Sequence, residues 1–144
     1  MKTIDELQEE VIEEFSDFTD WMDKYQLLID LGNDMQPLDA CYKTDANLIE
    51  GCQSRVWIVA DYHDGLLHFS AESDALIVKG LIVLLLRVLS GHSPQEILDA
   101  DLYFIDSIGL KDHLSPTRSN GLLAMVKQMR VYALAFKAKE DAEA

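Results

Sequence analysis

Hydrophobic residues recur at helical spacing in the first quarter of the chain and predict two amphipathic helices. The first opens at Thr3, where Glu6 completes a capping box, and its apolar face carries Ile4, Leu7, Val11, Phe15 and Phe18. The second begins near Thr19 or Asp20, and its apolar face carries Trp21, Tyr25, Leu28 and Leu31. We expect it to stop at Gly32-Asn33, a pair typical of a left-handed C-terminal cap.

The middle of the chain changes period and predicts a connector followed by a small sheet. In residues 33–47, around Pro37, the hydrophobic positions follow neither helical nor strand periodicity, and the segment is expected to form an ordered connector. Three segments rich in β-branched and aromatic residues follow, at 46–50, 55–62 and 66–71. Because Asp64-Gly65 is a strong hairpin signal, we predict a three-stranded antiparallel sheet.

The second half of the chain predicts three more helices. The segment from Leu76 to Leu89 is almost wholly apolar, so it should be the central buried helix, capped by Ser73 or Asp74. A capping box at Ser93-Pro94-Gln95-Glu96 opens a short helix that ends near Asp99. The last long helix starts at Ser115-Pro116, and its end, residues 139–144, is expected to fray.

This order of elements predicts an α+β fold. N-terminal helices precede the three-stranded sheet, and the C-terminal helices pack on one face of it. The chain has 144 residues, of which 49% are hydrophobic, enough for one sizeable core rather than two. We therefore expect residues 1–144 to form a single domain.

Charge narrows the classes of partner. Twelve basic against 26 acidic residues give a formal net charge of −14, which argues against nucleic acid and anionic membrane surfaces as partners. The longest uncharged apolar run, Gly80 to Leu86, is far too short to span a bilayer. The first residues lack the pattern of a signal peptide, so a cytoplasmic location is expected.

The two cysteines, Cys41 and Cys52, are the most pointed candidates for chemistry. They are too few for a disulfide framework, and the chain has no CxxC motif and no glycine-rich phosphate loop. Cys52 lies in Gly51-Cys52-Gln53-Ser54, between two predicted strands, so a hairpin tip would present its thiol. It is either a small buried hydrophobe or a nucleophile that accepts sulfur. A protease triad is disfavoured because the histidines, read as solvent-facing or turn residues, lie in no recognisable signature: His63, His68, His92 and His113.

Two charged residues stand near predicted helix starts. Arg118 lies in the first turn of the last helix, where the helix dipole disfavours a cation. It is either paired with a surface carboxylate or available to stabilise a thiolate or persulfide anion. Asp74 is first of all a helix-capping carboxylate. Trp57 is most simply a core or sheet-face residue.

Four sequence blocks, in order, resemble the SufE family of cysteine-desulfuration proteins, which includes CsdE. They are Trp21…Lys24-Tyr25…Leu28-Ile29…Leu31-Gly32, Ile49-Glu50-Gly51-Cys52-Gln53-Ser54-Arg55-Val56-Trp57, Ser73-Asp74-Ala75…Ile77-Val78-Lys79-Gly80-Leu81, and His113-Leu114-Ser115-Pro116-Thr117-Arg118-Ser119-Asn120-Gly121-Leu122. The resemblance implies a fold shared with IscU-type scaffold proteins and a sulfur-accepting cysteine at Cys52. It also places Asp74 and Arg118 beside the cysteine loop, with loop or supporting positions at Gly51, Gln53, Ser54, Arg55 and Trp57.

The resemblance implies a sulfur acceptor that activates a SufS- or CsdA-like cysteine desulfurase and relays persulfide sulfur to a SufBCD-like iron–sulfur scaffold. Pyridoxal phosphate is then expected in the desulfurase, and this chain needs no cofactor or metal of its own. A homodimer is compatible with the resemblance. The alternatives are a non-catalytic acidic adaptor with a structural cysteine, and a cluster scaffold, for which two thiols are too few ligands. Cys41, Arg55 and the acidic C-terminal extension depart from the family pattern.

Overall fold

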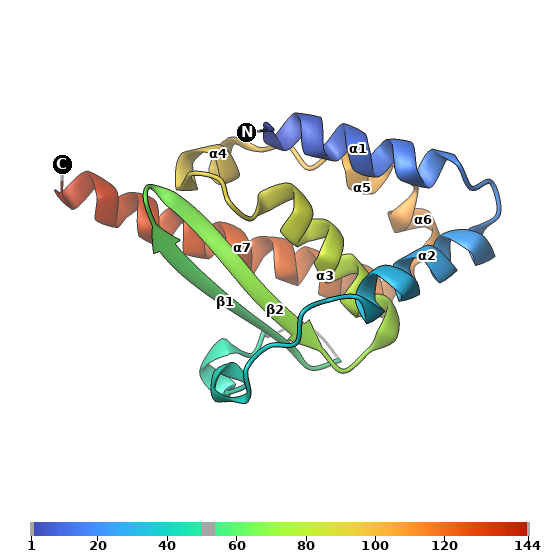
Figure 1. Cartoon of the computed structure of the whole chain (residues 1–144), viewed down its shortest axis with the longest axis horizontal. Coiled ribbons are helices and arrows are strands. Elements are labelled where there is room, and N and C mark those ends of the chain that lie inside the picture. The colour runs from blue at the N-terminus through green and yellow to red at the C-terminus, as the bar shows by residue number, and fades with distance from the viewer. Residues whose placement is uncertain (1, 50–53, 144) are drawn as a thin grey trace.

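The computed structural model describes residues 2–49 and 54–143 of the chain, and Figure 1 shows their arrangement. Helices precede and follow one β-hairpin, so the α+β class is confirmed. The helices are α1 (Ile4–Ser16), α2 (Trp21–Asn33), α3 (Leu76–Leu89), α4 (Pro94–Asp99), α5 (Phe104–Ser107), α6 (Leu110–His113) and α7 (Pro116–Glu143). The strands are β1 (Val56–His63) and β2 (Leu66–Ser73), and two 3₁₀ turns, η1 (Ala40–Tyr42) and η2 (Asp45–Asn47), lie in the connector before them.

Local capping signals explain why the first two helices begin where the sequence predicts. In α1 the Glu6 amide donates to Thr3 Oγ1 at 3.1 Å, and the Thr3 amide donates to Glu6 Oε1 at 3.2 Å. In α2 the Asp20 carboxylate accepts from the Met22 amide at 2.9 Å. Both N-terminal helices are therefore confirmed, each starting from a side chain that satisfies a free backbone donor.

The predicted left-handed cap at Gly32-Asn33 is wrong. Both residues belong to α2, and neither has a positive φ. Gly32 instead lets α2 approach α3, because a Cβ there would lie 2.7 Å from the Lys79 Cβ. Gly80 is tighter still, since its Cβ would lie 2.2 Å from the Leu28 carbonyl oxygen. The two glycines thus allow backbone-to-backbone packing of α2 on the central helix.

The sheet of the described residues has two strands, where the sequence predicts three. Only one isolated bridge, Leu48 to Trp57, represents the first predicted strand, with the Ile49 amide donating to the Val56 carbonyl at 2.8 Å. The residues before it form the 3₁₀ turn η2, and the Asn47 side chain donates to the Tyr42 carbonyl at 2.8 Å. Because the Asn47 side chain bonds within this turn, the residues of η2 do not pair as a strand, and pairing with β1 begins only at Leu48.

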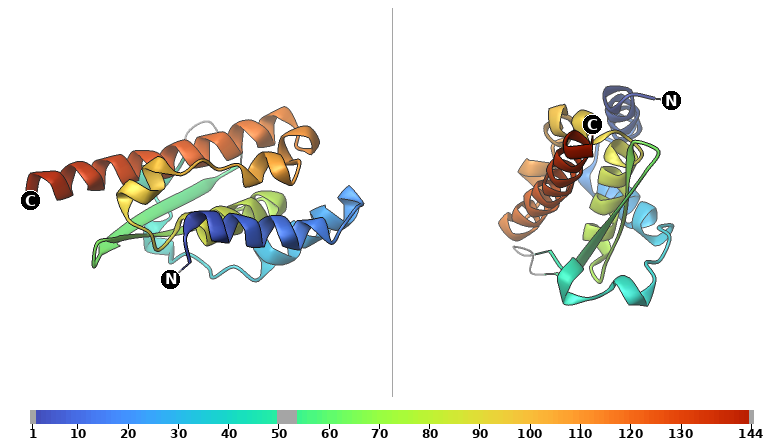
Figure 2. Two further views of the ribbon diagram at one scale, coloured as in Figure 1. Left: turned by 90° about the horizontal axis from the view of Figure 1, so that it is seen from above. Right: turned by 90° about the vertical axis from the view of Figure 1, so that its left-hand side faces the viewer.

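The hairpin itself forms as the Asp64-Gly65 signal predicts. Both turn residues have positive φ, 55° and 77°, as a type I′ turn requires. The register pairs Val56 with Ser73. One face of the hairpin is buried against α3 and α7, the two helices that lie on the same side of it in Figure 2. The buried residues on that face are Val56, Ile58, Leu67, Phe69, Ala71 and Ser73.

The central helix and the C-terminal helix differ from the sequence predictions at their ends. The residue that caps α3 is Ala75, and neither Ser73 nor Asp74 caps it with a side chain. At the other end of the chain, α7 continues to Glu143, and the Tyr62 hydroxyl donates to the Glu140 carboxylate at 2.6 Å. The helix therefore includes residues 139–143 of the segment that the sequence expects to fray. None of the helices in the described part of the chain is both long and apolar enough to cross a membrane.

Candidate functional site

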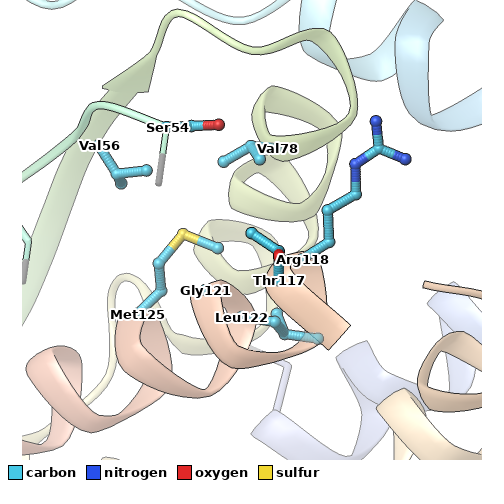
Figure 3. Close-up of a pocket in the computed structure, with 8 residues that line it drawn as sticks. All are labelled: Ser54, Val56, Val78, Thr117, Arg118, Gly121, Leu122 and Met125. Atoms are coloured by element: carbon cyan, nitrogen blue, oxygen red, sulfur yellow. The ribbon is translucent and has the colours of Figure 1, made fainter. Parts of the chain in front are cut away.

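A small pocket lies where the start of β1 meets α3 and the first turns of α7. Its empty volume is about 290 Å³, including the open mouth. Figure 3 shows its lining: Ser54, Val56, Val78, Thr117, Arg118, Gly121, Leu122 and Met125. Ser54 is the first described residue after 50–53, and it follows the candidate cysteine by two positions in the sequence.

The interior of the pocket is apolar because three elements each direct a buried side chain into it. Val56 comes from β1 and Val78 from α3, while Leu122 and Met125 come from successive turns of α7. Each of these side chains is less than a tenth exposed. A group that enters this space meets carbon and the Met125 thioether.

Arg118 brings a positive charge to the rim of this apolar space. Its backbone is fixed by the start of α7, where the Arg118 amide donates to Ser115 Oγ at 3.3 Å. In Figure 3 its guanidinium extends away from the apolar interior. The side chain is exposed and makes no ion pair with any residue the structure describes. The surface ion pair that the sequence left open is thus not found in the described part of the chain.

Asp74 fastens the backbone at the entrance to β1. The Arg55 amide donates to Asp74 Oδ1 at 3.2 Å, and the Asp74 amide donates to the Arg55 carbonyl at 3.4 Å. This pair extends the hairpin ladder one step beyond Val56 and Ser73. The sequence predicts Asp74 as a helix cap, and the structure shows a strand-end clamp instead. Its carboxylate is drawn to Arg55 because the hairpin register brings these two residues opposite each other.

Comparison with known proteins identifies the group to which this arrangement belongs. The family model SufE, described as an Fe-S metabolism associated domain, matches residues 9–133. The chain belongs to the SufE family. The sequence resemblance is therefore confirmed over most of the chain, and the family associates it with iron–sulfur metabolism.

Individual SufE relatives agree with this assignment. An uncharacterized SufE-like protein of Synechocystis is 38% identical over 127 residues, which cover 88% of this chain and 80% of the relative. One from Rhizobium meliloti is 37% identical over 127 residues, covering 85% and 91%. The solution structure of a hypothetical protein from Thermus thermophilus matches 90% of this chain and 94% of its own, with a TM-score of 0.73 and 21% identity. That last likeness shows a shared fold.

The remaining residues named by the SufE resemblance are not all at the pocket. Gly51, Cys52 and Gln53 lie outside the described residues. Trp57 lies on the outer face of the hairpin, opposite Glu72, and the Lys43 ammonium is 5.8 Å from its ring. The indole therefore does not line the pocket and belongs to the contact between the hairpin and the connector.

Glu72 joins that connector to the outer face of the hairpin. It accepts from the Leu38 amide at 2.9 Å and forms an ion pair with Lys43. Partial burial opposes ionisation, yet the hydrogen bonds from Lys43 and Leu38 outweigh it and lower the pKa of Glu72. Nothing in the local sequence distinguishes the Glu72–Lys43 pair from other surface charges, so it could not be predicted from the sequence.

Cys41, the second thiol of this SufE-family chain, lies apart from the pocket on η1, where it is exposed. Its amide donates to Asp39 Oδ1 at 3.1 Å. A hydrogen bond between the thiol and the same carboxylate raises the pKa of Cys41 above its ordinary value, with burial and the negative charge acting in the same direction. A thiol held protonated is a poor nucleophile, so Cys41 is not poised to attack a persulfide.

None of the four histidines lines the pocket. His92 is buried, with Nε2 3.0 Å from the Lys2 carbonyl oxygen, so the expectation of solvent-facing or turn histidines is wrong for this one. His63 and His68 stack on each other with ring centroids 4.4 Å apart, and His113 stacks on Trp21 at 3.9 Å. Among the described residues, no group of three or more His, Cys, Asp or Glu side chains is placed to hold a metal ion.

Proposed function

We propose that this SufE-family protein accepts sulfur on Cys52 from the persulfide of a cysteine desulfurase and relays it to iron–sulfur cluster assembly. Family membership carries the proposal, because it ties the chain to iron–sulfur metabolism. The apolar pocket with Arg118 at its rim supports it, since this space begins at Ser54, two residues after the proposed acceptor.

The transfer balances without an added oxidant or reductant. The Cys52 thiolate attacks the outer sulfur of the desulfurase persulfide, and a new sulfur–sulfur bond forms. The original sulfur–sulfur bond breaks, and its electron pair leaves on the desulfurase cysteine, which is restored as a thiolate. Cys52 then carries the persulfide. A proton on the transferred sulfur either stays on it, as the terminal sulfur of the new persulfide, or is released to solvent. Pyridoxal phosphate stays in the desulfurase, so this chain requires no cofactor of its own.

The charge near residue 54 suits an anionic sulfur. Arg118 supplies a positive charge with no carboxylate partner among the described residues, and such a charge favours a thiolate over a thiol. Asp74 keeps Arg55 paired at the end of the hairpin, three residues after the proposed acceptor in the sequence. Once the desulfurase has passed its sulfur to Cys52, a SufBCD-like scaffold would take the sulfur from Cys52. The transfer would occur in the cytoplasm, where thiols are kept reduced.

Peptide mapping after incubation with a purified SufS-like desulfurase and cysteine tests this function. The expected result is a gain of about 32 Da, one sulfur atom, on the peptide that contains Cys52. Cys52→Ser should abolish both this gain and the stimulation of desulfurase turnover, whereas the matched variant Cys41→Ser should retain both. Persulfide on Cys41 would overturn the assignment. Stimulation that persists in Cys52→Ser would favour the non-catalytic adaptor.

A further inference from the structure

The outer side of α7 carries an apolar stripe that no described element covers. Leu123, Val131 and Leu134 are 52%, 47% and 61% exposed, so three of the six exposed large hydrophobic side chains among the described residues lie on this one helix. At about 100° per residue they fall with Lys127 within a wedge of about 80°. We call these four residues the α7 stripe. Figure 2 shows α7 along one side of the molecule, with its outer side turned to solvent.

An apolar pocket adjoins the N-terminal end of the α7 stripe. It lies between α5 and α7 and is lined by Ile105, Ser119, Leu122 and Leu123, with an empty volume of about 470 Å³ including its mouth. A hollow of this kind beside exposed leucine suits an anchoring side chain from another protein, the usual centre of a binding hot spot. The stripe and the hollow share the Leu123 side chain.

The charge of α7 indicates what covers this surface. From Pro116 to Lys139 the helix contains no Asp or Glu and five basic residues, although the chain as a whole has a net charge of −14. Lys127 is exposed in the middle of the stripe, between Leu123 and Val131. A partner that packs on the leucines therefore meets a central cation, and a carboxylate at that point would satisfy it.

We propose that the α7 stripe docks an amphipathic helix of a partner protein, with apolar residues at helical spacing and acidic residues beside them. A straight helix surface of about 17 Å between Leu123 and Leu134 matches three turns of such a partner. A second copy fits less well, because a two-fold contact would set stripe against stripe. Neither copy of Lys127 would then find a carboxylate there. The hollow beside the stripe shares Leu122 with the pocket at Ser54, but none of the four stripe residues lines that pocket, and the proposed use of the stripe does not depend on sulfur transfer.

A pair of designed peptides tests the proposal on the full chain. One peptide is a helix of about 21 residues with Leu at the a and d heptad positions and Glu at e and g, and its match replaces every Glu by Lys. Fluorescence anisotropy should give a Kd on the order of 10 μM for the Glu peptide and at least tenfold weaker binding for the Lys peptide.

Variants of the chain then locate the contact. Leu134→Glu should weaken binding of the Glu peptide at least tenfold, while Lys127→Glu should reverse the preference between the two peptides. Met22→Glu is the matched control, because Met22 is an exposed apolar residue on α2 (71% exposed) and should leave binding unchanged. Circular dichroism confirms that each variant keeps its helices.

Three outcomes would overturn the proposal. The first is equal or absent binding of the two peptides by the wild-type chain, and the second is an equal loss in Met22→Glu. The third is a wild-type dimer in sedimentation equilibrium that Leu134→Glu dissociates, which would make a second copy the occupant. Persulfide mapping of Leu134→Glu separates this proposal from the function proposed above. Sulfur uptake should persist in that variant, and its loss would point to the desulfurase as the protein that covers α7.

Discussion

Asp74 and Arg55 face each other across the end of the hairpin, joined by two hydrogen bonds of 3.2 and 3.4 Å. One of these bonds uses the Asp74 carboxylate, so a side chain completes a ladder step that backbone groups alone leave open. Arg55, three residues after the candidate cysteine in the sequence, is therefore tied to the end of β2 through one acidic residue.

Asp74→Ala should loosen the start of β1. The loss of one partly exposed hydrogen bond costs about 1 kcal/mol in the free energy of unfolding. Hydrogen exchange should accelerate at the amides of Arg55 and Val56 more than at the centre of the hairpin. Asp74→Asn is the control, since its amide oxygen still accepts from the Arg55 amide. Equal protection in Asp74→Ala and wild type would show that the clamp contributes nothing to local stability.

Much of the fold can be predicted from local sequence signals. The predictions that are wrong concern residues whose structure depends on contacts with residues distant in the sequence. Capping boxes and the Asp64-Gly65 turn set element boundaries from within a few residues, which is why the sequence places them correctly. The predicted cap at Gly32 is wrong because the role of this glycine is to allow close packing against α3, which is distant in the sequence. The third predicted strand is mostly lost because a 3₁₀ turn with its own side-chain bond occupies part of the segment.

The candidate site shows the same division. Family motifs pick out Ser54 and Arg118, but the apolar lining is built from ordinary core residues such as Val78 and Met125, which carry no local mark. One relation was open to sequence reasoning. A two-residue turn at Asp64-Gly65 fixes an antiparallel register that sets residue 55 opposite residue 74, so the clamp follows from the turn.

Arg118→Ala should make the Cys52 thiol less reactive, because it removes the positive charge that favours the thiolate. We expect alkylation of Cys52 at pH 7 to slow roughly three- to tenfold, corresponding to a higher thiol pKa. Arg118→Lys should recover part of the rate. The control is Lys137→Ala, which removes a cation near the far end of the same helix, where it pairs with Asp141. An unchanged pH profile in Arg118→Ala would remove the arginine from the mechanism.

Asp39→Asn should make Cys41 more reactive. In the wild type, hydrogen bonding to the Asp39 carboxylate raises the pKa of the Cys41 thiol, so less thiolate is present than for an unperturbed thiol. Removing the negative charge lowers that pKa and increases the thiolate fraction. Iodoacetamide kinetics in a Cys52→Ser background measure the effect on one thiol alone. A rate that falls or stays constant in Asp39→Asn would show that Asp39 acts only through its bond to the Cys41 amide.

Gly80→Ala should destabilise the protein strongly, because the added methyl would lie 2.2 Å from the Leu28 carbonyl oxygen in the packed pair α2 and α3. Overpacking of this kind costs about 3 kcal/mol in the free energy of unfolding, visible as a lower midpoint in urea. Gly65→Asn serves as the comparison, since position 65 has open space and asparagine tolerates its positive φ. A loss in Gly80→Ala no larger than in Gly65→Asn would mean that the two helices separate without cost.

The contact between Tyr62 and Glu140 predicts a pH-dependent end to α7. The hydrogen bond to the Glu140 carboxylate, together with burial and nearby negative charge, raises the pKa of Tyr62 from 10.0 to about 12. Because the folded pKa lies above the unfolded one, the stabilisation is complete below pH 10 and is lost as the pH rises towards 12. Burial and a hydrogen bond to Glu9 raise the pKa of Tyr103 as well, so the difference in tyrosinate absorbance between the wild type and Tyr62→Phe isolates the late titration of Tyr62. Glu140→Gln should return its pKa towards 10, and the same high pKa in that variant would exclude Glu140 as the cause.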